Sequence, residues 1–173
     1  AAAPAGAETF LAMFSTRKRC TRFSGNSDVS TAVFSASGDV ISQLTLGNWS
    51  YSAPPGIVLG AALARSGDQF FALWNCYDPA RPTACEHSPV CLCGARFGPD
   101  GTMLGASNFP PISVPQPYVA GDGSGWLVAW VAPDYTLRAS RILTDGTVEP
   151  DTTAASSAHR LLGLVHDGEH YVA

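Results

Sequence analysis

Short apolar runs alternate along the chain with turns rich in glycine and aspartate. Three of the runs share a pattern of six residues in which nearly every position is apolar and the last is aromatic. These runs are Thr9–Phe14, Gln69–Trp74 and Gly125–Trp130, and a fourth copy opens at Glu169–Ala173, one residue short of its aromatic end. Apolar runs of this length without polar alternation predict β-strands that are buried on both faces.

A second repeated element follows each complete copy and carries glycine at a fixed place. It covers Val33–Val40, Arg96–Met103 and Arg141–Val148, and the last two contain an Asp-Gly pair. Asp-Gly readily adopts the left-handed backbone conformation that tight hairpin turns require. Each copy therefore predicts two strands joined by a hairpin turn.

A third, apolar element precedes the aromatic strand at Val58–Ala64, Tyr118–Ala120 and Leu161–Val165. The repeating unit is thus four short strands joined by turns, which is the blade of a β-propeller. We predict an all-β propeller of four-stranded antiparallel blades, of which about three and a half are present. The expected limits are residues 1–50, 51–115 and 116–157 for three blades and 158–173 for the start of a fourth.

The best-preserved repeat reads Gly-x-x-aromatic-Leu-Val-x-Trp, a variable loop, and then Arg-x-x-x-Asp-Gly-Thr-Val. This pattern resembles the propeller repeats of bacterial secreted and surface proteins. Residues 123–148 carry the match best, residues 67–103 match with an insertion, and residues 8–40 are degenerate. The Trp-Asp signature of WD40 blades and the Ser-x-Asp-x-Gly-x-Thr-Trp box of sialidases do not occur in the sequence.

Three blades and two further strands cannot close a ring that needs about four to eight blades. The remaining blades would come from a longer chain or from a second copy, which would give a ring of about seven blades. We favour the longer chain, since natural chains rarely stop inside a core strand.

The composition of the chain argues against several classes of protein. Charged residues make up 14% of the 173 positions and the formal net charge is -4. The 46% hydrophobic content can fill a core and argues against disorder, while the low charge argues against a coiled coil. No apolar run approaches the roughly 18–20 residues of a membrane span, and the mild acidity gives no support for a nucleic-acid partner. Nearly all the basic residues are arginine, which suggests a GC-rich bacterial genome.

The five cysteines bear on the cellular compartment of the protein, because they can form disulfides. Four of them lie between positions 76 and 93. We expect disulfides, Cys76–Cys91 across the mouth of a hairpin and Cys85–Cys20 between blades, with Cys93 left over. Disulfides favour an extracellular, periplasmic or cell-surface location. Two alternatives remain open, free buried thiols and a zinc site. The zinc ligands would be Cys85, His87, Cys91 and Cys93, although the one-residue spacing of the last two cysteines departs from the usual knuckle.

The long irregular segments of the predicted propeller all emerge on one face, and such loops commonly carry function. We therefore expect a ligand to bind there, with a protein or a glycan as partner. The predicted loops are 15–28, 47–55, 75–89, 108–116 and 151–159.

Eight residues in these loops are candidate binding residues. The basic cluster can attract an anionic partner or simply stay solvated, and the aromatic rings can stack on sugars or pack between blades. The candidates are Arg17, Lys18, Arg19, Arg22, Trp49, Tyr77, Asp78 and Arg81.

No catalytic residue can be assigned from linear motifs. Phosphate loops, nucleophile elbows and metalloprotease signatures do not occur, and the four histidines form no base-and-orienter spacing. We favour a non-catalytic binding or assembly module of a secreted or surface protein, without a cofactor. The first alternative is part of a carbohydrate-active propeller hydrolase or lyase, whose carboxylates would converge from several blades to within ~5–10 Å. The second is a structural subunit of a larger complex.

Overall fold

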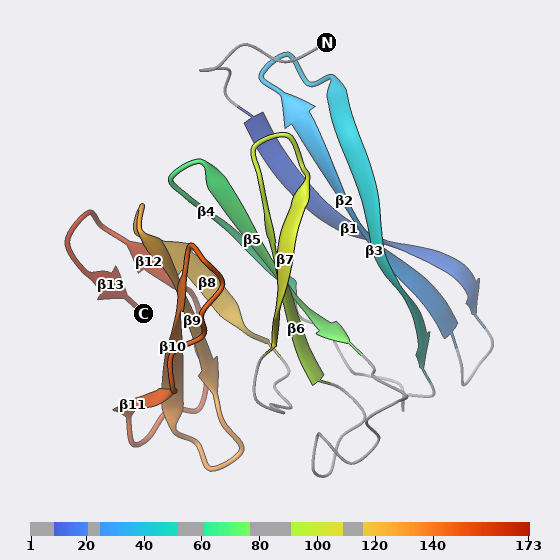
Figure 1. The fold of residues 1–173 in the computed structure, drawn as a ribbon. Helices are drawn as coiled ribbons and strands as arrows, with labels where there is room; N and C mark the ends of the chain where they lie inside the picture. Colours follow the sequence, from blue (N-terminus) through green and yellow to red (C-terminus); the bar gives the residue numbers. More distant parts are fainter. Residues whose placement is uncertain (1–8, 21–24, 52–60, 77–90, 109–115) are drawn as a thin grey trace.

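The computed structural model describes residues 9–20, 25–51, 61–76, 91–108 and 116–173 (Figure 1). Across these ranges the chain forms strands and turns and no helix. The strands make four antiparallel sheets, two of them four-stranded, and in each sheet neighbouring strands follow one another in the chain. The prediction of an all-β protein with four-stranded antiparallel sheets is confirmed. Since the described part of the chain has no helices, it contains none that crosses a membrane.

We call the sheets A to D in chain order. Sheet A contains β1 (Thr9–Cys20), β2 (Gly25–Ser35) and β3 (Val40–Tyr51). Sheet B contains β4 (Ala61–Ser66), β5 (Gln69–Cys76), β6 (Cys91–Phe97) and β7 (Met103–Asn108). Sheet C contains β8 (Tyr118–Gly121), β9 (Gly125–Val131), β10 (Leu137–Leu143) and β11 (Thr152–Ala155). Sheet D is the hairpin of β12 (Val165–His166) and β13 (Tyr171–Val172).

The three predicted glycine turns are present. Gly38, Gly101 and Gly146 all have left-handed φ angles, of 88°, 83° and 95°. Each donates its backbone N–H to the carbonyl oxygen three residues earlier, at 2.9 to 3.0 Å. These turns join β2 to β3, β6 to β7 and β10 to β11, as the repeated element predicts.

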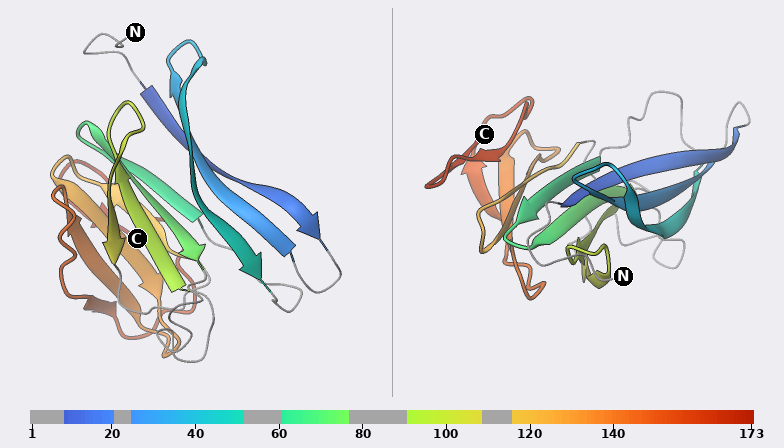
Figure 2. Two further views of the ribbon diagram at one scale, coloured as in Figure 1. Left: turned by 45° about the vertical axis from the view of Figure 1, so that its right-hand side comes forward. Right: turned by 90° about the horizontal axis from the view of Figure 1, so that it is seen from above.

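The sheets stack face to face in chain order, and the core lies between them (Figure 2). Phe70 and Ala72 of β5 pack toward Leu11 and Val33 of sheet A. Phe71, which alternates with them along β5, packs on sheet C. Because successive side chains of a strand point to opposite faces, one apolar strand fills two interfaces. The prediction that this strand is buried on both faces is confirmed for β5 and β9.

The first strands of successive sheets lie next to one another. β4 contacts β8, β8 contacts β12, and β1 of the three-stranded sheet A contacts β4. Within the described residues the four sheets form an open row, with sheet A at one end and sheet D at the other (Figure 1).

Two predicted loops form strands in their described residues. Residues 15–20 and 25–28 continue the hairpin of β1 and β2, with Ser15 opposite Val29 and Arg17 opposite Ser27. Segment 47–55 begins inside β3, which runs to Tyr51. The polar residues of these segments resembled loop sequence, but the hydrogen bonds of a β-ladder join backbone groups and do not require apolar side chains. Segment 151–159 likewise contains β11, and most of 75–89 and 108–116 lies outside the described residues.

The fourth copy of the apolar pattern is shifted by one residue from its expected register. Gly67, Gly123 and Gly168 occupy the turn before the aromatic strand and share left-handed φ angles. Counting from these glycines places Tyr171 level with Phe70 and Trp126. The fourth copy therefore starts at His170 rather than at Glu169.

Candidate functional site

The structure places part of the predicted basic cluster on a strand. Arg17 lies opposite Ser27, and a bulge follows before Arg19 pairs with Asn26. Trp49 also lies opposite Ser27, from the other side of β2, so Arg17 and Trp49 occupy one row across sheet A. Expecting them in irregular loops was therefore wrong. Four further candidate residues lie outside the described part of the chain: Arg22, Tyr77, Asp78 and Arg81.

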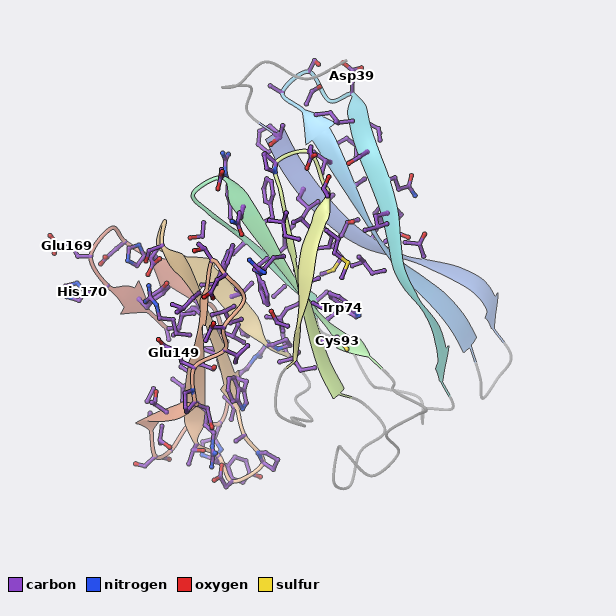
Figure 3. All side chains as sticks on the ribbon, in the orientation of Figure 1. Asp39, Trp74, Cys93, Glu149, Glu169 and His170 are labelled. Atoms are coloured by element: carbon purple, nitrogen blue, oxygen red, sulfur yellow. The ribbon has the colours of Figure 1, made fainter. Side chains whose placement is uncertain are left out.

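Cys76 and Cys91 are direct Cα partners where β5 and β6 part, so the backbone is compatible with the predicted Cys76–Cys91 bond. Cys20 ends β1, and Cys85 lies outside the described residues. Cys93, opposite Trp74 in sheet B (Figure 3), is disulfide-bonded, so the expectation that it is left over is wrong. Because the two predicted pairs use all four of the other cysteines, at least one of Cys76–Cys91 and Cys85–Cys20 is wrong as well.

The zinc alternative gains no support from this arrangement. A sulfur held in a disulfide cannot act as the thiolate that zinc requires. Of the four proposed ligands, Cys85 and His87 lie outside the described residues. Among the residues that the structure does describe, no group of three or more metal-ligating side chains comes together.

One part of the predicted ligand face has described side chains, and it centres on the turn between β9 and β10. In this turn Tyr135 donates its N–H to the Ala132 carbonyl, and Ala132 donates to the Thr136 carbonyl, both at 2.9 Å. Tyr135 has a φ angle of 61°, which makes it the one non-glycine residue in the left-handed region within the described ranges. Its carbonyl oxygen accepts a hydrogen bond from the N–H of Ala158 at 2.6 Å.

This conformation projects the tyrosine ring from the end of sheet C. Tyr135 is 58% exposed, and its ring centroid lies 5.2 Å from that of His159 at an interplanar angle of 55°. One side of the Tyr135 ring thus contacts the His159 ring, and the other side is exposed to solvent.

A charged network lies beside the two rings. The Arg138 guanidinium donates to Asp151 Oδ2 at 3.0 Å and to Asp134 Oδ2 at 3.3 Å. Thr136 donates its hydroxyl and its N–H to Asp134 Oδ1 at 2.6 and 3.2 Å. These Thr136 bonds, together with the positive charge of Arg138, lower the pKa of Asp134. The two carboxylates raise the pKa of Arg138 in turn.

We call this group, Asp134, Tyr135, Arg138, Asp151 and His159, the Tyr135 site. It combines an exposed aromatic surface with fixed carboxylate oxygens and a planar guanidinium. An arrangement of this kind can stack on an apolar ring face and exchange hydrogen bonds with hydroxyl groups around its edge.

A second polar cluster lies in sheet C, next to Tyr171 of sheet D. Arg141 Nη2 lies 2.6 Å from Asp122 Oδ2 and 2.8 Å from the Ser124 hydroxyl. Burial alone would raise the pKa of Asp122, but hydrogen bonds from Ser124 and Arg141 outweigh it and hold that pKa far below its usual range. Burial and the Asp122 carboxylate raise the pKa of the Tyr171 phenol. The Asp122 carboxylate is thus satisfied by groups of sheet C, whereas the buried Tyr171 hydroxyl of sheet D has no hydrogen-bond partner.

The Tyr135 site was not predicted from the sequence. The β9–β10 turn is short and was not among the predicted loops, and its Pro-Asp-Tyr-Thr sequence contains no glycine or asparagine that would indicate a left-handed residue. The one available signal was an aspartate two residues before a threonine, which is typical of turns.

Comparison with protein-family models and with curated proteins finds no match for this chain. Proposals about its function therefore depend on the fold and on the residues described above.

Proposed function

We propose that the chain is a non-catalytic, glycan-binding module of a secreted or cell-surface bacterial protein, and that its sheets are successive blades of a β-propeller. The propeller interpretation is supported by meandering sheets that stack in chain order with their first strands adjacent. The disulfide at Cys93 favours an oxidising compartment.

The observation that carries the binding proposal is the conformation of Tyr135. A left-handed φ at a bulky side chain costs about 1–3 kcal/mol and persists when the surroundings enforce it. Here the hydrogen bond from Ala158 and the His159 ring hold the tyrosine in place while its ring stays 58% exposed. A strained and exposed aromatic residue on a rigid sheet is better explained by contact with a ligand than by packing.

The side chains around Tyr135 are of the kinds that can bind a sugar. Sugar rings offer an apolar face to an aromatic side chain and a rim of hydroxyl groups to carboxylates and guanidinium groups. Asp134 and Asp151 are held by one guanidinium, so their acceptor oxygens are oriented before a ligand arrives.

The described residues favour binding over glycoside hydrolysis. A glycosidase needs one carboxylic acid whose pKa is raised so that it can donate a proton. In the described part of the chain, every carboxyl group with a shifted pKa is shifted downward. These groups are Asp100, Asp122, Asp134, Asp145 and Asp167.

The test is calorimetric titration of the protein with chitohexaose, cellohexaose and a heparin-derived hexasaccharide. We expect at least one of them to bind and Tyr135→Gly to weaken that binding at least tenfold. Glycine tolerates the left-handed turn, so the fold of this variant is preserved.

Tyr135→Phe is the matched control, because it keeps the ring and should retain most of the affinity. Failure of all three sugars to bind the wild-type protein, or equal binding by Tyr135→Gly, would contradict the proposal.

A further inference from the structure

The charges of the Tyr135 site are unbalanced. Two carboxylates, those of Asp134 and Asp151, share the single guanidinium of Arg138. With histidine counted as neutral, two negative charges against one positive charge leave the site with an excess of negative charge. This excess lies next to Tyr135, whose side chain is 58% exposed. The charge of a ligand therefore affects how well it binds here.

The positive charge of Arg138 is enclosed by its partners. Its Nη1 donates to Asp151 Oδ2 at 3.0 Å, its Nη2 donates to Asp134 Oδ2 at 3.3 Å, and its Nε donates to the Thr136 hydroxyl at 3.2 Å. All three guanidinium nitrogens thus have partners within the site. An anionic group that approached Arg138 would meet two carboxylates on the same guanidinium, and like charges in such proximity repel one another. The site therefore disfavours an anionic ligand.

The two carboxylates can accept further hydrogen bonds. Among the described residues, Asp151 is hydrogen-bonded through Oδ2 alone, so its Oδ1 is available to a ligand. Asp134 is held by the hydroxyl and the N–H of Thr136, which lower its pKa and keep the carboxyl ionised in mild acid. An ionised carboxylate makes its strongest hydrogen bonds with donors that carry a positive charge.

The ring of Tyr135 favours the same charge. The face of an aromatic ring carries partial negative charge and attracts a cation that comes within about 6 Å of its centre. The His159 ring lies on one side of the Tyr135 ring, so a ligand has access to the other side. The ring and the carboxylates thus both favour a positively charged ligand, and the guanidinium that opposes them is already paired.

We propose that the sugar bound at the Tyr135 site is a cationic amino sugar, of the kind found in a deacetylated chitin chain. Its ammonium groups donate to the carboxylate oxygens, Asp151 Oδ1 among them, while the apolar face of a sugar ring stacks on Tyr135. This inference rests on the glycan binding proposed above and adds the charge of the ligand to it. A lysine-rich peptide offers the same ammonium groups, but it lacks the flat apolar face that matches the exposed aromatic ring.

The experiment is calorimetric titration of the intact, oxidised protein with two matched ligands at neutral pH and low salt. The glucosamine hexamer and chitohexaose have the same length and linkages, and they differ in whether each amine is free or acetylated. We expect the glucosamine hexamer to bind at least about fivefold more tightly, because its ammonium groups add ion pairs and cation–π contacts. Added salt should weaken its binding more than it weakens the binding of chitohexaose.

Asp151→Asn tests whether the excess negative charge causes this preference. The substitution keeps the shape of the side chain and an acceptor oxygen for hydroxyl groups but removes one negative charge. The preference for the glucosamine hexamer should fall to about twofold or less, while chitohexaose binds as before. Equal weakening of both ligands would show a merely structural role for Asp151 and would overturn the proposal.

Asp39→Asn is the matched control for the change in net charge. Asp39 lies in the turn between β2 and β3 of sheet A, outside the Tyr135 site, and its side chain is exposed. This variant should keep the wild-type preference for the glucosamine hexamer. A loss of preference as large as that in Asp151→Asn would mean that the charge of the whole protein, and not the Tyr135 site, selects the ligand.

The results separate this inference from the proposed function. If chitohexaose or cellohexaose binds in a Tyr135-dependent way but the glucosamine hexamer binds no more tightly, glycan binding stands and the preference for a cation is overturned. Tighter binding of the heparin-derived hexasaccharide than of the glucosamine hexamer would overturn it as well. Tetralysine carries ammonium groups without a sugar ring, and its binding as tightly as the glucosamine hexamer would assign the site to a peptide instead. If none of the sugars binds, both proposals fail.

Discussion

The strands β1 and β9 carry the same six-residue apolar pattern but have different surroundings. Trp126 in β9 is fully buried between sheets B and C, whereas Phe10 at the equivalent position of β1 is 57% exposed. The glycine turns differ in the same way. A Cβ atom on Gly101 would meet Ser42 and Val33 of the preceding sheet, whereas one on Gly38 in sheet A would meet nothing within 4 Å. The local pattern specifies a strand or a turn, and the neighbouring sheet determines its burial.

The largest effect is expected from Trp126→Ala. The centroid of the Trp126 ring lies 5.5 Å from that of the Phe71 ring, and Trp126 Nε1 donates a hydrogen bond to the Ala64 carbonyl oxygen at 3.2 Å. Its removal leaves a cavity between two sheets and should lower the free energy of unfolding by about 3–5 kcal/mol. Chemical denaturation followed by circular dichroism measures the change. A loss below about 1 kcal/mol would mean that the B–C boundary is far looser than its burial implies.

Gly101→Ala and Gly38→Ala form a matched pair with a smaller expected difference. Both substitutions place a side chain at a left-handed φ, which costs about 1 kcal/mol. At Gly101 the new methyl group also comes within 2.7 Å of Val33 Cγ2, and overpacking of this kind adds about 1–3 kcal/mol. Equal losses in the two variants would show that the turn of sheet B does not press on sheet A.

Acid should weaken the ion pair between Asp122 and Arg141 in sheet C. The folded-state pKa of Asp122 is depressed, so its contribution is fully present above the unfolded pKa of about 3.9 and is lost as the pH falls below it. We expect a loss of about 1–2 kcal/mol on acidification, and Asp122→Asn should remove this part of the pH dependence.

Chemical denaturation of the wild-type protein and of Asp122→Asn, at neutral pH and at about pH 3, tests whether Asp122 causes the loss. Asp134→Asn is a useful control, because its ion pair with Arg138 is exposed to solvent and should contribute little to stability. The same pH dependence in wild type and Asp122→Asn would place the effect elsewhere.

The smallest effect is expected from Phe10→Ala. The Phe10 ring is exposed in sheet A, so truncation should change the unfolding free energy by no more than about 0.5 kcal/mol. The measurement is the same denaturation experiment used for Trp126→Ala. A loss close to that of Trp126→Ala would contradict the exposed position of this ring.

The strands and hairpins were predictable where local signals were strong. Continuous apolar runs and left-handed glycines act over a few residues, so the positions of β5, β9 and the Gly101 and Gly146 turns follow from the sequence. The length of the β1–β2 hairpin was not predictable in this way, because polar strands such as Arg17–Cys20 are held by backbone pairing. The Tyr135 site was missed because the contacts that enforce its turn come from Ala158 and His159, more than twenty residues later.

In the described part of the chain, each sheet is built from consecutive strands and makes its main contacts with its immediate neighbours. A whole repeat can therefore be duplicated or lost in a gene without rerouting any other segment. Only the side chains at the new boundary have to adapt, which makes the number of repeats an easily changed property in the evolution of proteins of this type.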